Sequence, residues 1–471
     1  MQKNRAIVFI NPPHKQYIQR KMRCSPVRSG YLFPPMELLY LATIIHTITD
    51  VEKVFIDAVV ERLSVDDIIA KIQQYDVQMI VFMPAVESWD VDVHALSLIK
   101  EAVNKHCFLV CFGYIPSLFY RELFNRFPTV DCVIIGEPDR TFQELCEIFF
   151  SDRKKIFDVK GLAFNIQHDY ITTERRHNEL VLDSLPIPDR KYLNNSLYGD
   201  PFVNKPMTAV MTGRGCLYAC TFCVNFYGVP FRLRSSENVL NELEQIVHEF
   251  NIRDIRFMDD HFTVDKQRTI AICKGIIDRS MNIRFTCLSR VDTLDEESIG
   301  YLKRAGCQMV FLGIESGSQR ILDYYNKRYT VDRIRQTCRI LKRAGIAFTG
   351  WFVIGAPIET PDDIRQSIRL ALDIKADFII VNELHIMPAT PLFNTLRDDL
   401  IVNLVPFSVS YQKRCIPSEA LPKYRYMFYV RFYVLSLYFI RNIGMCLKNP
   451  KRLWFFMKEF YSGIQKHYVE K

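Results

Sequence analysis

Long uncharged apolar runs are missing from this chain of 471 residues. The apolar stretch near the C-terminus, residues 425–447, is interrupted by Arg431 and Arg441, so it falls short of the ~20 residues that a membrane-spanning helix needs. Residues 1–10 form a short charged lead into a strand rather than a secretory signal. These absences argue against a transmembrane protein and predict a reducing, cytoplasmic compartment.

Paired cysteine spacings are also missing outside one short segment. The 14 cysteines show no disulfide framework. Cys107 and Cys111 lie in an apolar strand-like run, where we expect buried structural thiols. Six further cysteines follow the segment singly, which argues against an auxiliary cluster: Cys273, Cys287, Cys307, Cys338, Cys415 and Cys446.

Positive charge is scarce before residue 400 and concentrated after it. Residues 401–471 hold 12 Lys/Arg against 3 Asp/Glu, a surplus of 9, so residues 1–400 sum to −1 of the total of +8. Between residues 424 and 461, 13 aromatic residues are interleaved with the basic ones. This mixture favours a helix in the interface of an anionic membrane over nucleic acid. The alternative is an aromatic face packed on the preceding domain, with the Lys/Arg side chains solvated.

Residues 1–150 alternate apolar strands and helices. We expect strands at 6–10, 53–56, 79–83, 108–112 and 132–135. This alternation predicts an α/β fold with a doubly wound, Rossmann-like parallel sheet. Gly113 and Gly136 lie just past two strand ends, where ligands of such sheets bind.

A second alternating series occupies residues 206–400, after a linker with a small hairpin at 151–205. Its expected strands are 207–211, 254–258, 284–288, 309–314, 347–354 and 378–384. Six strand–helix steps are two short of a closed barrel, so the sequence predicts an open (β/α)6 crescent. Residues 401–471 are expected to form a helical tail rich in basic and aromatic residues.

Three cysteines follow the first strand of the crescent with the spacing Cys-x3-Cys-x2-Cys: Cys216, Cys220 and Cys223. Three thiolates on one short loop suit three corners of a [4Fe–4S] cubane and leave the fourth iron open to a substrate or cofactor. The alternatives are buried apolar cysteines or part of a zinc site. Loops after the strands are also where parallel barrels place their chemistry.

Polar residues follow three later strands of the crescent. Asp259 and Asp260 come after the second strand, Glu315 and Ser316 after the fourth, and Gly355 ends the fifth. Each alone reads as a helix cap or a tight turn. Together with the cysteines they predict a polar rim at the carboxyl ends of the strands.

Five stretches resemble the successive signatures of radical SAM enzymes that carry an N-terminal cobalamin-binding domain: residues 214–223, 231–235, 257–260, 306–318 and 350–360. The resemblance runs across residues 5–400. It implies that the three cysteines bind a [4Fe–4S] cluster whose open iron chelates S-adenosylmethionine (SAM). It also implies that Asp259 or Asp260 meets the SAM ammonium, that Glu315 and Ser316 meet its polar edge, and that backbone near Gly355 flanks adenine.

The N-terminal residues resemble the cobalamin domain less closely. Residues 34–42, Gly113 and Gly136-Glu137 carry the likeness, which implies bound cobalamin. Glu37 and Pro138-Asp139 depart from the family pattern, and no Asp-x-His-x-x-Gly motif supplies a histidine below cobalt. The alternative is a flavodoxin-like domain that only packs on the crescent.

The resemblance implies radical cleavage of SAM and cobalamin-dependent methyl transfer to an unactivated carbon or phosphinate centre. Alternatives are ring closure, rearrangement or oxidation without methyl transfer, and a non-catalytic iron–sulfur or cobalamin-binding partner module. A tRNA methylthiotransferase needs a further cysteine trio and an RNA-binding β-barrel, and neither is seen. The expected partners are a low-potential electron donor such as flavodoxin or ferredoxin and a small-molecule or lipid-like substrate. A peripheral membrane contact through residues 424–461 is also expected, and nucleic acid is not. No catalytic side chain is identified.

Overall fold

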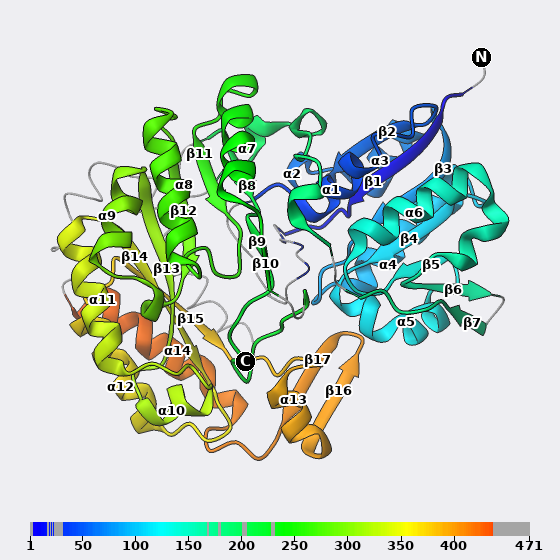
Figure 1. Ribbon diagram of the computed structural model, residues 1–471. Coiled ribbons are helices and arrows are strands. Elements are labelled where there is room, and N and C mark those ends of the chain that lie inside the picture. The colour runs from blue at the N-terminus through cyan, green and yellow to red at the C-terminus, as the bar shows by residue number, and fades with distance from the viewer. Residues whose placement is uncertain are drawn as a thin grey trace. The chain divides into compact units, whose positions relative to one another are not determined.

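The computed structural model describes residues 3–16, 18, 20, 22, 32–166, 169–177, 180–199, 205–227 and 231–436. The chain forms two compact units (Figure 1). The first comprises Met1–Gly199, Asn225–Arg232 and Asn403–Ser408, and the second comprises Asp200–Val224, Leu233–Val402 and Val409–Lys471.

The first unit is built on a seven-stranded sheet in the order β2-β1-β3-β4-β5-β6-β7. The first five strands run parallel, and β6 and β7 continue the sheet as an antiparallel hairpin. The strands are β1 (Arg5–Asn11), β2 (Glu52–Asp57), β3 (Asp76–Phe82), β4 (Phe108–Phe112), β5 (Cys132–Ile134), β6 (Leu162–Ile166) and β7 (Asp169–Thr172). The predicted doubly wound sheet is confirmed. The hairpin expected within a linker is instead hydrogen-bonded to β5.

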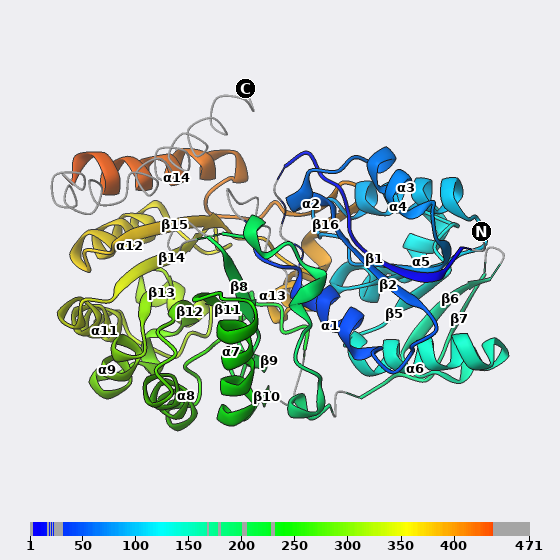
Figure 2. The ribbon, with the colours of Figure 1, turned by 90° about the horizontal axis from the view of Figure 1, so that it is seen from above.

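Helices cover both faces of this sheet. Figure 2 shows α3 and α4 on one face and α1 and α6 on the other. Because both faces are covered, the inner strands are continuous apolar runs, and all five residues of β4 are buried. The helices are α1 (Met36–Ile44), α2 (Ala58–Glu61), α3 (Val65–Ile72), α4 (Trp89–Val103), α5 (Tyr114–Arg126) and α6 (Pro138–Ser151).

The second unit contains a six-stranded, all-parallel sheet in the order β15-β14-β13-β12-β11-β8. The strands follow one another in chain order, which confirms the predicted open (β/α)6 crescent. They are β8 (Met207–Val210), β11 (Asp254–Phe257), β12 (Arg284–Ser289), β13 (Cys307–Glu315), β14 (Ala347–Ile354) and β15 (Phe378–Glu383).

The crescent's helices alternate with its strands, and short elements connect them. The larger helices are α7 (Ser236–Glu249), α8 (Lys266–Asp278), α9 (Glu296–Arg304), α11 (Val331–Ala344) and α12 (Pro361–Asp373). The shorter elements are α10 (Gln319–Tyr324), α13 (Pro391–Leu396), β9 (Gly213–Arg214), β10 (Arg232–Leu233), β16 (Leu400–Leu404) and β17 (Phe407–Tyr411). Side-chain caps start several of these helices. The Thr360 hydroxyl and the Asp363 carboxylate form a capping box at the start of α12, for example.

The described part of the tail packs on the crescent. Helix α14 (Leu421–Tyr429) continues into a π-helical turn (Val430–Leu435) beside α12 and β15 (Figure 2). The hydroxyls of Tyr429 and Tyr433 accept hydrogen bonds from the N–H groups of Val381 (3.1 Å) and Ile379 (3.0 Å). They satisfy donors of β15, which lies at the sheet edge. This segment therefore follows the packing alternative, while residues 437–461 lie outside the described residues.

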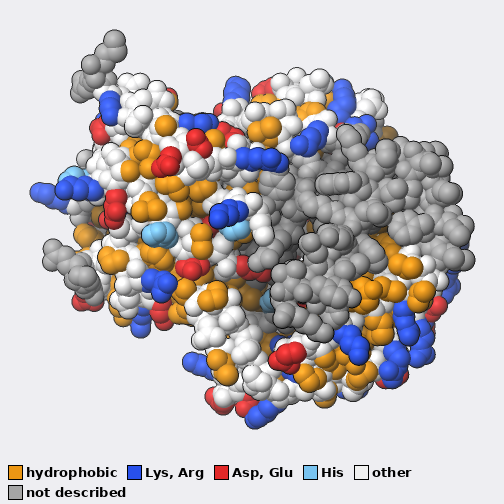
Figure 3. All heavy atoms as spheres, turned by 180° about the vertical axis from the view of Figure 1, so that it is seen from behind, with side chains coloured by type: hydrophobic (Ala, Val, Ile, Leu, Met, Phe, Trp, Pro, Cys, Tyr) orange, Lys and Arg blue, Asp and Glu red, His pale blue; other side chains and the backbone are white. Residues whose placement is uncertain are grey.

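Two further observations bear on membranes and nucleic acid. Within the described ranges, no helix combines the length and the apolar character needed to cross a bilayer. On the face shown in Figure 3, Lys, Arg, Asp and Glu side chains of the described residues are interspersed, without a broad area of one charge.

Candidate functional site

The cysteine motif lies on the loop that follows β8, and Asp259 holds the start of this loop. Asp259 Oδ1 accepts hydrogen bonds from the backbone N–H groups of Thr212 (2.5 Å) and Gly213 (3.2 Å), and Oδ2 accepts one from the Thr212 hydroxyl. Asp259 is 2% exposed. Its carboxylate therefore fixes the backbone just before Cys216.

All three thiols of the motif are carried by this loop. Cys216 and Cys220 are half-buried, Cys223 is exposed, and none of the three is in a disulfide. The N–H of Cys223 donates to the carbonyl of Cys220 (3.2 Å), which closes a turn. Burial raises the pKa of Cys216 and the negative charge of Asp260 adds to the effect, so the Asp260 carboxylate lies near the motif. Metal binding must displace this thiol proton.

Three cysteines on one loop fit the ligand set of a [4Fe–4S] cubane. Among the residues that the structure describes, no three His, Cys, Asp or Glu side chains converge as the ligands of one metal ion would. A cubane makes a different demand, since each thiolate binds its own iron at a separate corner. Three thiolates on one loop then leave one iron without a protein ligand.

The segment after α10 holds the far end of the cysteine loop. The N–H of Thr221 donates to the carbonyl of Tyr325 (3.1 Å), and the side-chain amide of Asn326 donates to the carbonyl of Ala219 (2.8 Å). The ring of Phe222 lies edge-on to the ring of Tyr325, with centroids 4.7 Å apart. The loop is thus anchored on both sides of Cys220.

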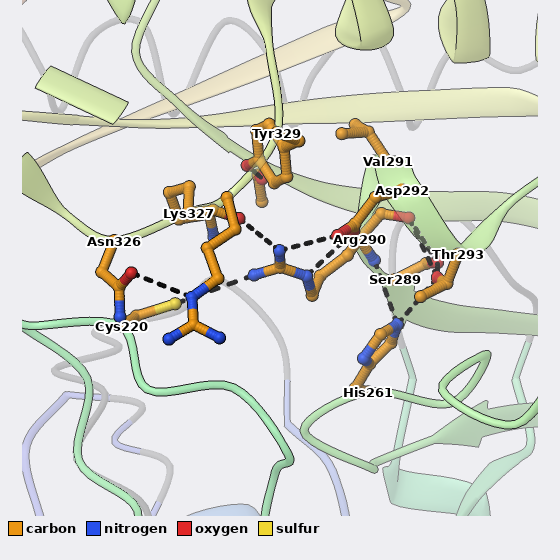
Figure 4. A network of polar contacts seen from close by, with 12 residues as sticks. Cys220, His261, Ser289, Arg290, Val291, Asp292, Thr293, Asn326, Lys327 and Tyr329 are labelled. Atoms are coloured by element: carbon orange, nitrogen blue, oxygen red, sulfur yellow. Dashed lines mark hydrogen bonds and ion pairs between the residues drawn. The ribbon is translucent and has the colours of Figure 1, made fainter. Parts of the chain in front are cut away.

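Arg290, just after β12, extends toward Cys220 of the motif (Figure 4). Its Nη1 donates toward Cys220 Sγ at 3.7 Å. Its Nε and Nη2 each donate to one carboxylate oxygen of Asp292 at 2.9 Å, and Nη2 also donates to the carbonyl of Lys327 at 2.5 Å. The guanidinium carbon lies 3.6 Å from the ring centroid of Tyr218. Arg290 therefore links the third strand to the cysteine loop.

Glu315 is paired with a buried lysine. Glu315 has a φ of +63° at the end of β13, and its Oε1 accepts a hydrogen bond from Lys327 Nζ at 2.9 Å. Lys327 is 4% exposed. Burial alone would lower the pKa of Lys327, but the Glu315 charge and then Tyr329 outweigh it, so the pKa is raised. Lys327 therefore stays charged, and it lies close enough to Cys220 for their charges to interact.

His261, next to Asp260, is a neutral buried histidine. Its Nε2 lies 2.9 Å from Thr293 Oγ1 (Figure 4) and 3.3 Å from Thr263 Oγ1. Its ring packs against that of Tyr218. Its Nδ1 is buried and has no hydrogen-bond partner among the described residues. Burial, helped by the Arg290 charge, lowers its pKa to about 3. It is therefore uncharged at neutral pH.

Ser316 and Gly355 have structural roles in two backbone turns. The Ser316 hydroxyl lies 3.1 Å from the hydroxyl of Ser367 on α12 and accepts a hydrogen bond from the N–H of Ser318 (3.1 Å). Gly355 has a φ of +92°, and a Cβ there would lie 2.7 Å from Leu421 Cδ1. Only glycine adopts this turn without strain.

The structure thus brings part of the predicted rim together. Asp260 lies near Cys216, and Glu315 reaches the motif through Lys327, whereas Asp259 and Ser316 are engaged in holding loops. Sequence reasoning missed Arg290 and Lys327. The signal for Arg290 was available, since Ser289-Arg290 is a polar pair at the carboxyl end of a strand. Lys327 had no such signal.

The first unit carries the residues predicted for cobalamin. Gly113 (φ +121°) and Gly136 (φ +85°) follow β4 and β5. The N–H of Gly136 donates to Ser117 Oγ at 3.1 Å. The Glu137 carboxylate forms an ion pair with Arg232 at 2.8 Å, and both side chains are largely buried. Glu137 therefore contributes to packing through this pair.

At the carboxyl edge of this sheet, buried polar side chains occupy the region after β1 to β3, whereas there is space beside Gly136 after β5. At β1 to β3, Arg20 forms a buried ion pair with Asp92 (2.6 Å) and also donates to Asn11, which in turn donates to Asp57. At β5, a Cβ added to Gly136 would meet no atom of the described residues within 4 Å.

Glu37, in the first turn of α1, also has an acceptor atom that lacks a donor in the described part of the chain. Its Oε2 is buried without a hydrogen-bond partner among the described residues. A buried acceptor without a donor and open space beside a glycine both fit a further group at this edge, and a corrinoid is one such group.

A parallel sheet followed by a (β/α)6 crescent with a three-cysteine loop is the architecture of an iron–sulfur enzyme of the radical SAM class. The Radical SAM superfamily model matches residues 210–371. The chain is 30% identical to an uncharacterised methyltransferase of Pyrococcus horikoshii over 467 residues, covering 95% of this chain and 97% of that protein.

Two solved structures share the fold. One is the cobalamin-dependent S-adenosylmethionine radical enzyme OxsB with aqua-cobalamin and S-adenosylmethionine bound. It matches with a TM-score of 0.74 and 16% identity, over 99% of this chain and 72% of that one. The other is the radical S-adenosylmethionine methyltransferase TsrM from Kitasatospora setae with cobalamin and [4Fe–4S] cluster bound. It matches with a TM-score of 0.67 and 16% identity, over 84% of this chain and 78% of that one.

The chain belongs to the radical SAM superfamily. The predicted family is confirmed, and with it an enzyme that uses a [4Fe–4S] cluster and SAM. Such an enzyme needs a reductant and a small-molecule substrate.

Proposed function

We propose that this chain is a cobalamin-dependent radical SAM methyltransferase acting on an unactivated carbon or a phosphinate centre of a small molecule. The observation that carries the proposal is the combination, in one chain, of the three-cysteine loop on the crescent and a parallel sheet with an open carboxyl edge at Gly136. The likeness to the Pyrococcus horikoshii methyltransferase, which spans both units, supports methyl transfer. The OxsB and TsrM folds support cobalamin as the second cofactor.

Bound here, the cluster would supply the electron that cleaves SAM to a 5′-deoxyadenosyl radical, and cobalamin would carry the methyl group. The chain's residues position these groups. Asp259 fixes the cysteine loop, and Asp260 receives the SAM ammonium. Glu315 faces the polar edge of SAM, held by Lys327, and the backbone at Gly355 flanks adenine. Ser316 acts indirectly, by fixing the turn that follows Glu315.

In the first unit, the backbone turns at Gly113 and Gly136 would face cobalamin. Glu137 supports these turns through its ion pair with Arg232 rather than by direct contact. No histidine motif is available below cobalt, so the bound form should be base-off, with water or nothing as its lower ligand.

The partners follow from this chemistry. A low-potential donor of the flavodoxin or ferredoxin type would reduce the cluster, and the substrate would be a small or lipid-like molecule. Nucleic acid is not part of the proposal, because charges of both signs alternate over the described surface in Figure 3. We place the protein in the cytoplasm, with a peripheral membrane contact through the segment 424–461 as a further part of the proposal. Residues 424–436 of this segment pack on the crescent, which favours the packing alternative for that part.

Anaerobic reconstitution tests the proposal. Protein supplied with hydroxocobalamin should hold about one cluster and about one corrinoid per chain, read from iron analysis and the absorption spectrum. Incubation with SAM and a one-electron reductant should yield both S-adenosylhomocysteine and 5′-deoxyadenosine by mass spectrometry. Protein that stays free of corrinoid yet forms 5′-deoxyadenosine would favour ring closure, rearrangement or oxidation instead. Protein that binds both cofactors but cleaves no SAM would favour the non-catalytic module.

A further inference from the structure

The guanidinium of Arg290 lies against one cysteine of the motif (Figure 4). Its Nη1 donates toward Cys220 Sγ at 3.7 Å, an ordinary separation for a large acceptor such as sulfur. We propose that Arg290 is a positioning residue that raises the reduction potential of the cluster by donating a hydrogen bond to the Cys220 sulfur. The proposal rests on a cluster at the three cysteines and is independent of methyl transfer and of cobalamin.

Contacts on several sides fix the orientation of this guanidinium. Nε and Nη2 form a bidentate ion pair with the Asp292 carboxylate, with both hydrogen bonds at 2.9 Å. Nη2 also donates to the carbonyl of Lys327, and the ring of Tyr218 covers the guanidinium at 3.6 Å. A planar group held at one edge and stacked on one face has little freedom to turn. The direction of Nη1 toward the sulfur is therefore set by the fold.

The charges are arranged so that the positive end faces the sulfur. Asp292 binds the Nε–Nη2 edge, and Nη1 points to Cys220. The Arg290 side chain is 7% exposed and the Asp292 side chain is 24% exposed, so water screens the carboxylate more than the guanidinium. Lys327 contributes less, since Glu315 neutralises it at 2.9 Å. Arg290 therefore contributes positive potential at the Cys220 sulfur.

A positive field at a cluster ligand favours the reduced cluster. Reduction adds one electron from the donor to the iron–sulfur core, and no bond forms or breaks and no proton moves. Hydrogen bonds to the sulfurs and local net charge are the factors that set the potentials of such clusters. Tyr218 lies between Cys216 and Cys220 in the sequence, so the same loop that provides the thiolates also carries the ring that holds Arg290 in place.

The test is an EPR-monitored redox titration of the reconstituted full-length protein without SAM, so that no contact to SAM contributes. Arg290→Gln removes the charge and leaves Asp292 unpaired, so the midpoint potential should fall. Arg290→Lys keeps the charge but loses the bidentate pair with Asp292, so the midpoint potential should fall by less than in Arg290→Gln. Asp292→Asn keeps Arg290 and removes the opposing charge, so the potential should rise. Arg256→Gln is the matched control, because Arg256 is also a buried arginine of the crescent but stacks on Phe311 instead.

Opposite shifts for Arg290→Gln and Asp292→Asn, both larger than the control shift, would support the proposal. If Arg290→Gln fails to hold four irons, Arg290→Lys and Asp292→Asn still decide the matter. Midpoint potentials for these two within the control shift would overturn it. Cluster content of the unmodified protein is measured first, so a protein without a cluster would refute the proposed function rather than the role of Arg290.

Discussion

The buried carboxylate of Asp259 provides the sharpest test of how the crescent builds its cysteine loop. Asp259→Ala removes the acceptor for two backbone N–H groups, those of Thr212 and Gly213, and for the Thr212 hydroxyl. The hydroxyl can turn to another acceptor, but the two N–H groups are fixed by the backbone. We therefore expect local loosening of the loop, with the sheet intact.

The magnitude follows from the two backbone donors. A hydrogen bond to a charged acceptor contributes about 1.5–3 kcal/mol. Since 1.4 kcal/mol corresponds to a factor of ten, each lost bond should speed local exchange of its amide roughly ten- to a hundredfold. The loop that carries Cys216 should then hold iron less firmly, because the loss of its anchor lowers the fraction of time in the liganding geometry.

Hydrogen exchange measured by mass spectrometry on peptides covering residues 207–224 would detect this change, with iron content measured in parallel. Asp254→Ala is the control, since Asp254 is also buried and lies at the other end of β11, where its ion pair with Arg284 is far along the strand from the loop. Asp260→Asn should leave the iron content unchanged, unlike Asp259→Ala, but should weaken SAM binding measured by calorimetry. Unchanged exchange in Asp259→Ala, with full iron content, would show that the loop does not depend on this carboxylate.

Three further outcomes follow from the same structure. Changing all three motif cysteines to Ala should abolish the four-iron absorption and SAM cleavage, and a retained four-iron cluster would contradict the assignment. Gly355→Ala should lower the free energy of unfolding by about 2–4 kcal/mol, because φ is positive and Leu421 lies in the way. The control Gly300→Ala, in open space on α9, should be neutral or stabilising. Burial raises the pKa of Glu359 from 4.5 to about 7, so its contribution to stability is fully present below pH 4.5 and is lost as pH rises to about 7, by about 3 kcal/mol in all. Glu359→Gln should flatten that part of the thermal-stability profile, and an unchanged profile would place the titration elsewhere.

The architecture could be predicted because buried strands and helices have recognisable patterns of apolar residues in this sequence. Strands covered on both faces read as continuous apolar runs, and the crescent's six expected strands differ from the observed ones by at most two residues at either end. Which strands pair with one another within a sheet was harder to predict. The hairpin β6–β7 joins the first sheet because β5 offers a free edge, which local sequence does not express.

Side-chain roles in the site were only partly predictable. Asp259 and Asp260 read as one acidic pair, but consecutive residues at the end of a strand point in opposite directions. Asp259 therefore turns to the loop after β8, while Asp260 lies near Cys216. Lys327 reaches the site only because the chain after α10 folds back over Glu315, a contact between residues with no local pattern.

The charges around the cysteine loop suggest why the site needs this arrangement. In the network of described side chains, Arg290 is paired with Asp292 and Lys327 with Glu315, while the Asp260 carboxylate lies near Cys216. SAM carries an ammonium, a carboxylate and a sulfonium, and so has a net positive charge. We expect the Asp260 carboxylate to attract the SAM ammonium, while the Arg290 guanidinium places positive charge beside the Cys220 sulfur for the incoming electron. Both buried cations near the cysteine loop can be held there because each has its own carboxylate partner, Asp292 for Arg290 and Glu315 for Lys327, and an unpaired buried charge would be strongly destabilising.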